Sequence, residues 1–236
     1  MNKYEIPLAK MDYKGKELHM RVTGPMEKVR LGSCEKEPGT AKWLETLRLD
    51  DIVYDVGANV GAYSLIAGTK LGKAGRVYAF EPAAPSYAAL VTNIMANNLA
   101  ASIIPLPFAF GEKEGIEFLG LSSLEPGMAS HGMMSSPYPQ AVVFLPMDLF
   151  IERYKIPVPT MMKIDVDGGE VGVIKGARET LKNPKLREVL IEVRDDKIQE
   201  RFFIENVMKG AGFVLKEKQI LMSSVAGNVW NRLYAR

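Results

Sequence analysis

The sequence has little of what several classes of protein depend on. Its one cysteine, Cys34, excludes an intrachain disulfide and any cluster of cysteine ligands around a metal. The 30 basic and 28 acidic residues are mixed along the chain, and the lack of a concentrated basic stripe argues against nucleic acid as a partner. The N-terminus lacks the apolar core of a secretory signal. We therefore expect a cytoplasmic protein.

Two stretches lack charge. Residues 82–111 have no charged side chain, but the prolines and asparagines among them argue against a membrane span. Residues 121–150 have no lysine or arginine and are rich in methionine, serine and proline. Long segments between strands more often carry a function than not, and methionine provides an adaptable apolar surface. We expect this segment to bind a ligand; the alternative is a loop that only packs on the sheet.

The length of 236 residues allows one sizeable core, and strands that alternate with helices favour an α/β fold with a doubly wound parallel sheet. Strands are expected at 52–56, 76–80, 102–110, 161–166, 189–193, 212–217 and 228–235, and helices at 40–49, after 60, from 85, over 170–182 and over 197–209. The last two strands have no helix between them, which predicts an antiparallel edge. A hairpin over 4–23 is expected to decorate this sheet. We divide the chain into an N-terminal β-hairpin extension (1–35) and a domain (36–236) with an insertion at about 117–156.

The segment Ile52–Gly61 is the most informative part of the sequence. It predicts a buried strand that breaks at Gly57 and a helix that Gly61 allows to pack close to the strand. Asp55 would repel the pyrophosphate of a dinucleotide, and the spacing is Gly-x-x-x-Gly, not Gly-x-Gly-x-x-Gly. A cationic ligand fits better, and S-adenosylmethionine carries a sulfonium and an ammonium group.

A second acid, Glu81, ends the next predicted strand, where it can accept hydrogen bonds from ribose hydroxyls. Both a dinucleotide and S-adenosylmethionine contain ribose, so only Glu81 and Asp55 together favour S-adenosylmethionine. The alternative is a strand–turn–helix unit with incidental acids. Both acids, however, lie at the carboxyl ends of strands, where open sheets bind ligands.

A second acidic cluster follows the strand predicted at 161–166. Asp165 and Asp167 share one face if that strand continues through both, and two close carboxylates raise one another's pKa, which can prepare one as a general base. For Asp167 the alternative is a cap on the following helix. A magnesium site is conceivable, but two acids without further ligands are a weak signal, and we expect no metal.

Three polar residues before the first strand, Lys36, Glu37 and Thr40, have two interpretations. They could line the mouth of the cofactor site, or they could form a solvated helix cap, which is the commoner role and the one that we favour.

Six short motifs occur in a fixed order. They are Asp-Val-Gly-Ala-Asn-Val-Gly (55–61), Phe-Glu-Pro (80–82), Ala-Phe-Gly-Glu-Lys-Glu-Gly (109–115), Lys-Ile-Asp-Val-Asp-Gly-Gly-Glu (163–170), Lys-Gly-Ala (175–177) and Leu-Ile-Glu (190–192). The ordered set resembles the FkbM-type S-adenosylmethionine-dependent methyltransferases over roughly residues 36–217. The resemblance implies a Rossmann-like methyltransferase sheet of seven strands in the order 3-2-1-4-5-7-6. It also implies O-methylation of a hydroxyl on a sugar, glycolipid or polyketide-like molecule.

The resemblance assigns roles to individual residues. The methionine part of S-adenosylmethionine would be surrounded by Asp55, Gly57, Ala58, Asn59 and Gly61; Glu81 would hold the ribose, and the backbone of Ala109 and Phe110 would meet the adenine. Asp165 would lie by the methyl group. Asp165 is the expected general base with Asp167 beside it, and His131, in the insertion, is the rival base.

The sequence departs from the family pattern in two places. Asp-Gly-Gly-Glu at 167–170 replaces the more usual Glu-Gly-Ala-Glu. Residues 120–146, within the insertion that we expect to bind the acceptor, match no known motif, so the acceptor is not identified. We expect a small-molecule, glycan or lipid acceptor, no nucleic acid partner and no transmembrane segment, and a homo-oligomer is open. The rival functions are an RNA methyltransferase, a dinucleotide-dependent oxidoreductase and a binding module without catalysis.

Overall fold

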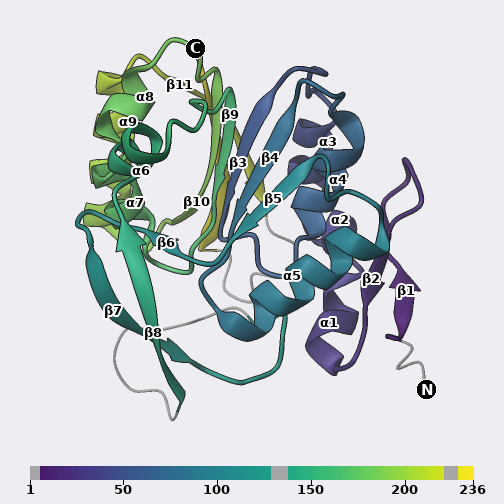
Figure 1. The fold of residues 1–236 in the computed structure, drawn as a ribbon. Coiled ribbons are helices and arrows are strands. Elements are labelled where there is room, and N and C mark those ends of the chain that lie inside the picture. Colours follow the sequence, from purple (N-terminus) through teal and green to yellow (C-terminus); the bar gives the residue numbers. More distant parts are fainter. Residues whose placement is uncertain (1–5, 129–137, 221–227) are drawn as a thin grey trace.

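A seven-stranded sheet runs through the structure, a computed structural model that describes residues 6–128, 138–220 and 228–236 (Figure 1). In spatial order the strands are β5 (Ile103–Leu106), β4 (Arg76–Phe80), β3 (Ile52–Val56), β9 (Met161–Ile164), β10 (Glu188–Arg194), β12 (Val229–Ala235) and β11 (Val214–Ile220). The predicted order 3-2-1-4-5-7-6 is confirmed. The first five strands are parallel, and β12 is antiparallel to both of its neighbours, as predicted.

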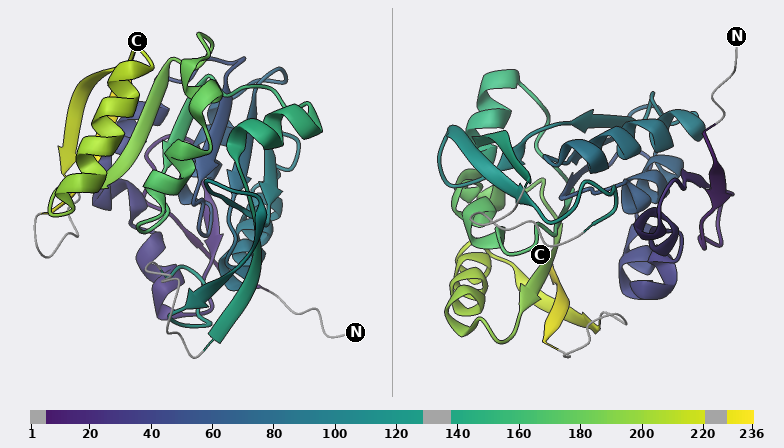
Figure 2. Two further views of the ribbon diagram at one scale, coloured as in Figure 1. Left: turned by 90° about the vertical axis from the view of Figure 1, so that its left-hand side faces the viewer. Right: turned by 90° about the horizontal axis from the view of Figure 1, so that it is seen from below.

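Helices cover both faces of this sheet (Figures 1 and 2). One face packs against α3 (Pro38–Leu44), α4 (Ala62–Lys70) and α5 (Ala84–Ala96), with α1 (Pro25–Arg30) and α2 (Ser33–Lys36) nearby; the other packs against α6 (Met147–Tyr154), α7 (Glu170–Lys175), α8 (Arg178–Lys182) and α9 (Ile198–Gly210). Successive residues of a strand point to opposite faces of the sheet, so Val53 belongs to one hydrophobic core and Tyr54 to the other. Within the described ranges, no helix has both the length and the apolar character that crossing a membrane requires.

The N-terminal strands β1 (Leu8–Lys10) and β2 (His19–Arg21) pair antiparallel in a sheet of their own. They attach to α5 and not to the seven-stranded sheet. The backbone N–H groups of His19 and Arg21 donate to the side-chain carbonyls of Asn97 (2.9 Å) and Asn93 (2.7 Å) on that helix. The division of the chain after residue 35 stays a prediction.

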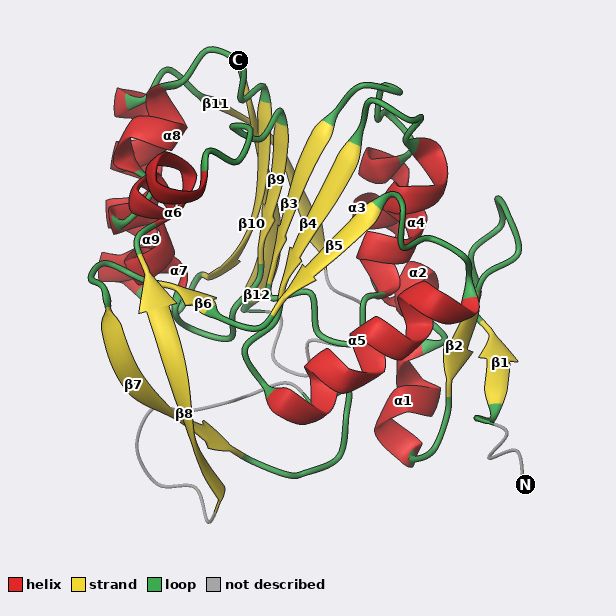
Figure 3. Cartoon of the chain, in the orientation of Figure 1, coloured by secondary structure: helices red, strands yellow, loops and turns green. Residues whose placement is uncertain are grey.

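A three-stranded sheet lies beyond the carboxyl ends of the parallel strands (Figure 3). It consists of β6 (Ala109–Phe110), β8 (Tyr138–Leu145) and β7 (Gly115–Leu121). The single strand predicted over 102–110 is therefore wrong. Strand β5 ends before Pro107, which has no N–H for a ladder, and the chain then joins β8 through β6.

Three further predicted elements differ from the structure. The helix predicted at 40–49 is α3, which begins at Pro38, a residue suited to a first helical position, and ends at Leu44. Strand β9 ends at Ile164, so the strand that would have carried both acids is wrong. The helix expected over 170–182 is two helices, α7 and α8. They separate at Gly176, where a Cβ would lie 2.1 Å from the carbonyl oxygen of Gly111.

Candidate functional site

The loop between β3 and α4 forms the centre of the site. Gly57 has φ +85°, and the N–H groups of Gly57 and Ala58 both donate to the carbonyl of Phe80, at 3.0 and 2.9 Å. A Cβ at Gly57 would lie 1.8 Å from the backbone oxygen of Asp165. Only glycine therefore fits here, and its contact brings the ends of three strands together.

Gly61, at the end of this loop, and Glu81, which follows β4, fix the position of the loop. Gly61 has φ +89°, and a Cβ there would meet the side chain of Leu90 on α5 at 2.4 Å, so this glycine permits the close packing that the sequence predicts. The buried Glu81 carboxylate accepts the N–H of Asn59 (2.8 Å) and of Ala83 (2.7 Å). Burial raises the pKa of Glu81 to about 7, although these two hydrogen bonds oppose the shift.

Asp55 lies beneath the loop, 3% exposed, and does not line the two cavities described below. Its carboxylate accepts a hydrogen bond from the Ser64 hydroxyl at 2.5 Å. Asp55 is in register with Lys163 of β9, which places both side chains on one face of the sheet. Burial raises the pKa of Asp55, while the Lys163 ammonium and the Ser64 hydrogen bond act against that rise.

Lys163 connects Asp55 to the cavity. Its ammonium lies 2.6 Å from Asp165 Oδ2 and 5.0 Å from the centre of the Tyr63 ring, and its side chain is only 4% exposed. Burial by itself would raise the pKa of Asp165, but the charge and hydrogen bond of Lys163 outweigh it and hold that pKa below its usual value. Asp165 is thus an ionised, ion-paired carboxylate.

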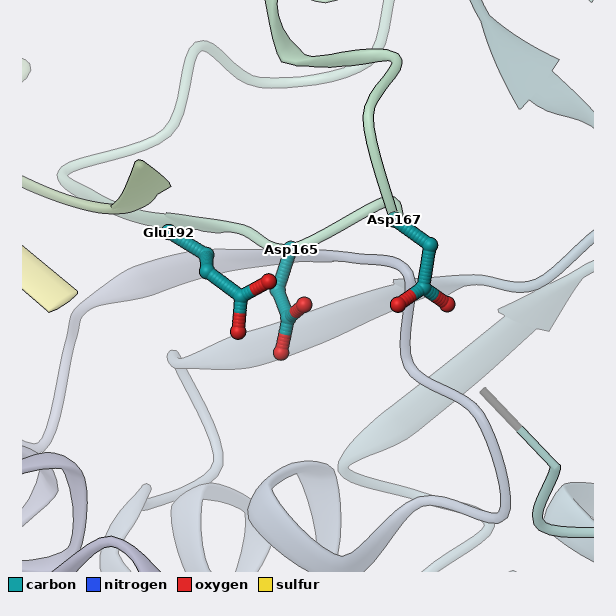
Figure 4. A group of neighbouring side chains, drawn as sticks. All are labelled: Asp165, Asp167 and Glu192. Atoms are coloured by element: carbon teal, nitrogen blue, oxygen red, sulfur yellow. The ribbon is translucent and has the colours of Figure 1, made fainter. Parts of the chain in front are cut away.

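Three carboxylates converge above this ion pair (Figure 4). Asp165 follows β9, Glu192 belongs to the neighbouring strand β10, and Asp167 comes from the turn before α7; their oxygens lie within 4.8 Å of one another. A metal ion could bind such a group, but Lys163 already neutralises Asp165, and we assign no metal here.

The turn at Asp167 has the left-handed φ of +54°. The N-cap residue of α7 is Gly169, and the interpretation of Asp167 as a cap stays a prediction. Glu170, the first residue of α7, stabilises this turn, because its Oε1 accepts the N–H groups of Val166 and Gly168, each at 3.1 Å. Asp167 lines the cavities described below.

Two adjoining cavities meet at the glycine loop. The larger, of about 610 Å³, is lined by Phe80, Phe108, Ala109, Phe110 and Phe144 together with the turn at 166–169, and also by Glu112, Lys113, Glu117 and Lys197. The smaller, of about 120 Å³, is lined by Asn59, Tyr63 and Glu81 and by the charged side chains Arg30, Lys36, Glu37, Lys163, Asp165, Asp167 and Glu192. Gly57, Pro82, Leu119, Val166 and Asp167 line both. The volumes suit an elongated ligand with an aromatic end and a charged end.

Glu37 is a buried wall of the smaller cavity and not a solvated cap, which corrects the interpretation that the sequence favoured. Its Oε2 accepts hydrogen bonds from the Thr40 hydroxyl (3.0 Å) and the Asn231 amide (2.9 Å). Lys36 also lines this cavity, whereas Thr40 is fully buried behind Glu37.

Two hydrogen bonds attach the insertion to the glycine loop and to α1. The Asn59 amide donates to the carbonyl of Met128 at 2.9 Å, and Arg30 Nε donates to the carbonyl of Gly127 at 2.8 Å. Leu119 of β7 lines both cavities. His131 lies outside the described residues.

Most of the cofactor residues expected from the sequence lie around the two cavities, with Asp55 beneath them. Sequence reasoning assigned no role to Lys163 or Glu192. A signal was present for Lys163, because it is a charged residue within an otherwise apolar strand, whereas Glu192 shares its strand with Glu188 and Arg194. Charged residues are rarely buried without a partner or a function.

The chain has relatives among known proteins. The family model described as the Methyltransferase FkbM domain matches residues 55–215. Hexuronic acid methyltransferase AglP of Haloferax volcanii is 29% identical over 153 residues, which are 64% of this chain and 59% of AglP. 31-O-demethyl-FK506 methyltransferase FkbM of Streptomyces tacrolimicus is 30% identical over 182 residues, 63% of this chain and 67% of that protein.

Solved structures share the fold. Methyltransferase FkbM from Methylobacillus flagellatus matches with a TM-score of 0.55 at 18% identity, covering 81% of this chain and 45% of that chain. Fibrillarin from Aeropyrum pernix, solved in complex with S-adenosylmethionine, matches with a TM-score of 0.52 at 14% identity, covering 98% of this chain and 83% of that chain. The chain thus spans less than two thirds of AglP and less than half of the Methylobacillus chain.

Proposed function

The chain belongs to the FkbM methyltransferase family, and from that premise we propose that it transfers a methyl group from S-adenosylmethionine to a hydroxyl of a sugar or related small molecule. The observation that carries the proposal is the pair of cavities joined at the glycine loop, one aromatic and one charged. When bound, S-adenosylmethionine supplies an electrophilic methyl group on a positively charged sulfur.

The residues present fit this cofactor. The aromatic cavity around Phe108 and Phe110 is large enough for adenosine, and the Glu81 carboxylate beside it can accept ribose hydroxyls. The charged cavity offers both positive and negative side chains, which the carboxylate and the ammonium group of the cofactor's methionine part need. Lys36 can face the cofactor carboxylate, and Glu37 can face its ammonium group. The methyl group would then be directed toward Asp165 and its acidic neighbours.

The choice of acceptor rests on the relatives and on charge. AglP is by its name a hexuronic acid methyltransferase, and FkbM by its name acts on 31-O-demethyl-FK506. We propose a hexuronic acid or a glycan that contains one as the first class to test. Arg30 lies on the cavity wall; its Nε donates to Gly127, and among the described residues its other N–H groups form no hydrogen bond, so they can pair with an acceptor carboxylate.

The rival functions have less support. An RNA methyltransferase would need basic residues around the acceptor cleft, and 121–150 has none. The family match favours methyl transfer over hydride transfer from a dinucleotide. Only a measurement of turnover can distinguish an enzyme from a binding module without catalysis.

The first test is cofactor affinity in the Glu81→Gln variant. We expect the wild-type protein to bind S-adenosylmethionine with a Kd in the micromolar range, about −8 kcal/mol. Glutamine has one acceptor oxygen in place of two, so one of the N–H groups of Asn59 and Ala83 loses its partner. Calorimetry should show binding weaker by about 1–3 kcal/mol, which is about 5–150-fold. Glu114→Gln, on an exposed ion pair with Arg153, is the control and should bind normally.

The affinity should also depend on pH. Because the pKa of Glu81 is raised to about 7, its carboxylate takes up a proton as the pH falls through 7 and loses an acceptor for ribose. Wild-type affinity should therefore decrease from pH 8 to pH 6, and this decrease should be smaller in Glu81→Gln. Affinity that is equal in both proteins at every pH would refute the role of Glu81.

A further inference from the structure

Glu192 occupies the position in the charged cavity best suited to receive a proton. It follows Ile191, which is in register with Ile164, so Glu192 lies beside Asp165 on the same face of the sheet. Its carboxylate lines the smaller cavity with Asp165 and Asp167 (Figure 4). Among the described residues, no side chain or backbone group forms a hydrogen bond or ion pair with this carboxylate.

Asp165, the base expected from the sequence, is held differently. Its Oδ2 contacts the ammonium of Lys163 at 2.6 Å, and that ammonium is buried against Tyr63. A carboxylate stabilised by a buried cation is a weak base, because taking a proton would leave the cation without its partner. Asp165 is therefore better suited to positioning than to accepting a proton.

We infer that Glu192, and not Asp165, contacts the acceptor hydroxyl and takes its proton during methyl transfer, an inference that rests on the proposed function. In this step the hydroxyl oxygen bonds to the methyl carbon while the carbon–sulfur bond breaks and leaves its electron pair on sulfur. The hydroxyl proton passes to an oxygen of Glu192, which later releases it to solvent. Charge balances, because the sulfonium becomes neutral as the carboxylate is neutralised.

The surroundings of the Glu192 carboxylate make its pKa sensitive to a bound cofactor. Burial raises the pKa of Glu192 to about 9, and Asp165, Asp167 and Glu170 raise it as well, while Lys163 lowers it. The remaining charged groups on the cavity wall are Arg30, Lys36, Glu37 and Glu81. A sulfonium placed in the same cavity stabilises the ionised carboxylate and lowers this pKa. Glu192 would thus be protonated without cofactor and become a base when the methyl donor arrives.

Proton release on cofactor binding tests this inference without an acceptor. Calorimetry at pH 8 in buffers of different ionisation enthalpy counts the protons released by S-adenosylmethionine and by S-adenosylhomocysteine, whose sulfur is neutral. Wild type should release a substantial fraction of one proton with the first ligand and distinctly less with the second. At pH 8 Glu81, with a pKa of about 7, is already ionised and contributes little.

The variants identify the residue that releases this proton. The extra release should be lost in Glu192→Gln and kept in Glu192→Asp. An amide at position 192 removes one acid from a crowded acidic group, so this variant is expected to fold, and its cofactor affinity should stay within about threefold of wild type. Equal release in wild type and Glu192→Gln would overturn the inference. No binding of S-adenosylmethionine to wild type would instead overturn the proposed function.

The rate of methyl transfer is the second readout. With glucuronic acid as the probe acceptor and saturating S-adenosylmethionine, Glu192→Gln should lower kcat by about 10²–10⁴-fold, the usual range for loss of a general base. Glu192→Asp should recover part of that loss. A near-normal rate in Glu192→Gln, with the loss found in Asp165→Asn, would return the role of base to Asp165.

Discussion

Replacement of Gly57 by alanine should destabilise the protein by about 2–5 kcal/mol and abolish cofactor binding. The residue has φ +85°, a conformation that costs a residue with a Cβ about 1–2 kcal/mol. The new Cβ would lie 1.8 Å from the backbone oxygen of Asp165 and 2.8 Å from its carbonyl carbon. A backbone carbonyl cannot rotate away as a side chain can, so the β3 and β9 loops must separate, at an overpacking cost of about 1–3 kcal/mol.

Gly212→Ala is the matched control for this prediction. Gly212 also has a left-handed φ, +88°, but no atom lies within 4 Å of the Cβ that alanine would introduce. Its cost should be that of the backbone alone, about 1–2 kcal/mol, with cofactor affinity unchanged. Urea denaturation measures both variants. Equal destabilisation by the two would show that the contact between Gly57 and Asp165 has no energetic role.

Lys163→Met should destabilise the protein by about 3–5 kcal/mol near pH 7, the usual result of removing one member of a buried ion pair. Methionine preserves the size of the aliphatic chain, so the loss comes mainly from charge. Asp165 loses the cation at 2.6 Å. Asp55, whose pKa burial already raises, loses the positive charge that opposes this rise. Lys182→Met, at an exposed pair with Glu179, is the control and should stay within about 0.5 kcal/mol of wild type.

The sign of the pH dependence identifies the cause. In wild type, neighbouring carboxylates raise the pKa of Lys163 although burial opposes this, so its contribution to stability is complete below pH 10.5. In Lys163→Met the buried carboxyls of Asp55 and Asp165 acquire raised pKa values. The folded variant then binds protons more tightly than the unfolded chain, and its stability falls as the pH rises above about 4. The deficit relative to wild type should therefore be smaller at pH 4 than at pH 8. A constant deficit would mean that packing, not charge, is lost.

Much of the sheet could be predicted because its signals are local. Strand β3, the break at Gly57 and strand β4 follow from short apolar runs and a glycine at a turn, and the structure has them at the expected residues. The strand order came from the ordered motifs. The antiparallel strands β7 and β8 were missed. They are separated by 16 residues, which is far longer than a hairpin turn, and their apolar and polar residues do not alternate regularly.

The candidate site was harder to predict because its walls come from distant parts of the chain. Glu37 is held by Asn231, 194 residues away, and no local pattern relates the two. The sequence placed Asp55 at the ligand, whereas strand alternation directs its side chain under the loop toward Lys163. Lys163 then changes the character of Asp165, an effect that depends on a cross-strand contact. The role of His131 and the cytoplasmic location stay predictions.

Transfer of a labelled methyl group tests the account most directly. The protein is incubated with S-adenosylmethionine labelled in its methyl group and with hexuronic acids and glycans that contain them, and in parallel with tRNA. The account predicts label in an ether on a hydroxylated acceptor, formed together with an equal amount of S-adenosylhomocysteine. Label in the tRNA, or no label in any hydroxylated acceptor although the cofactor binds, would contradict it.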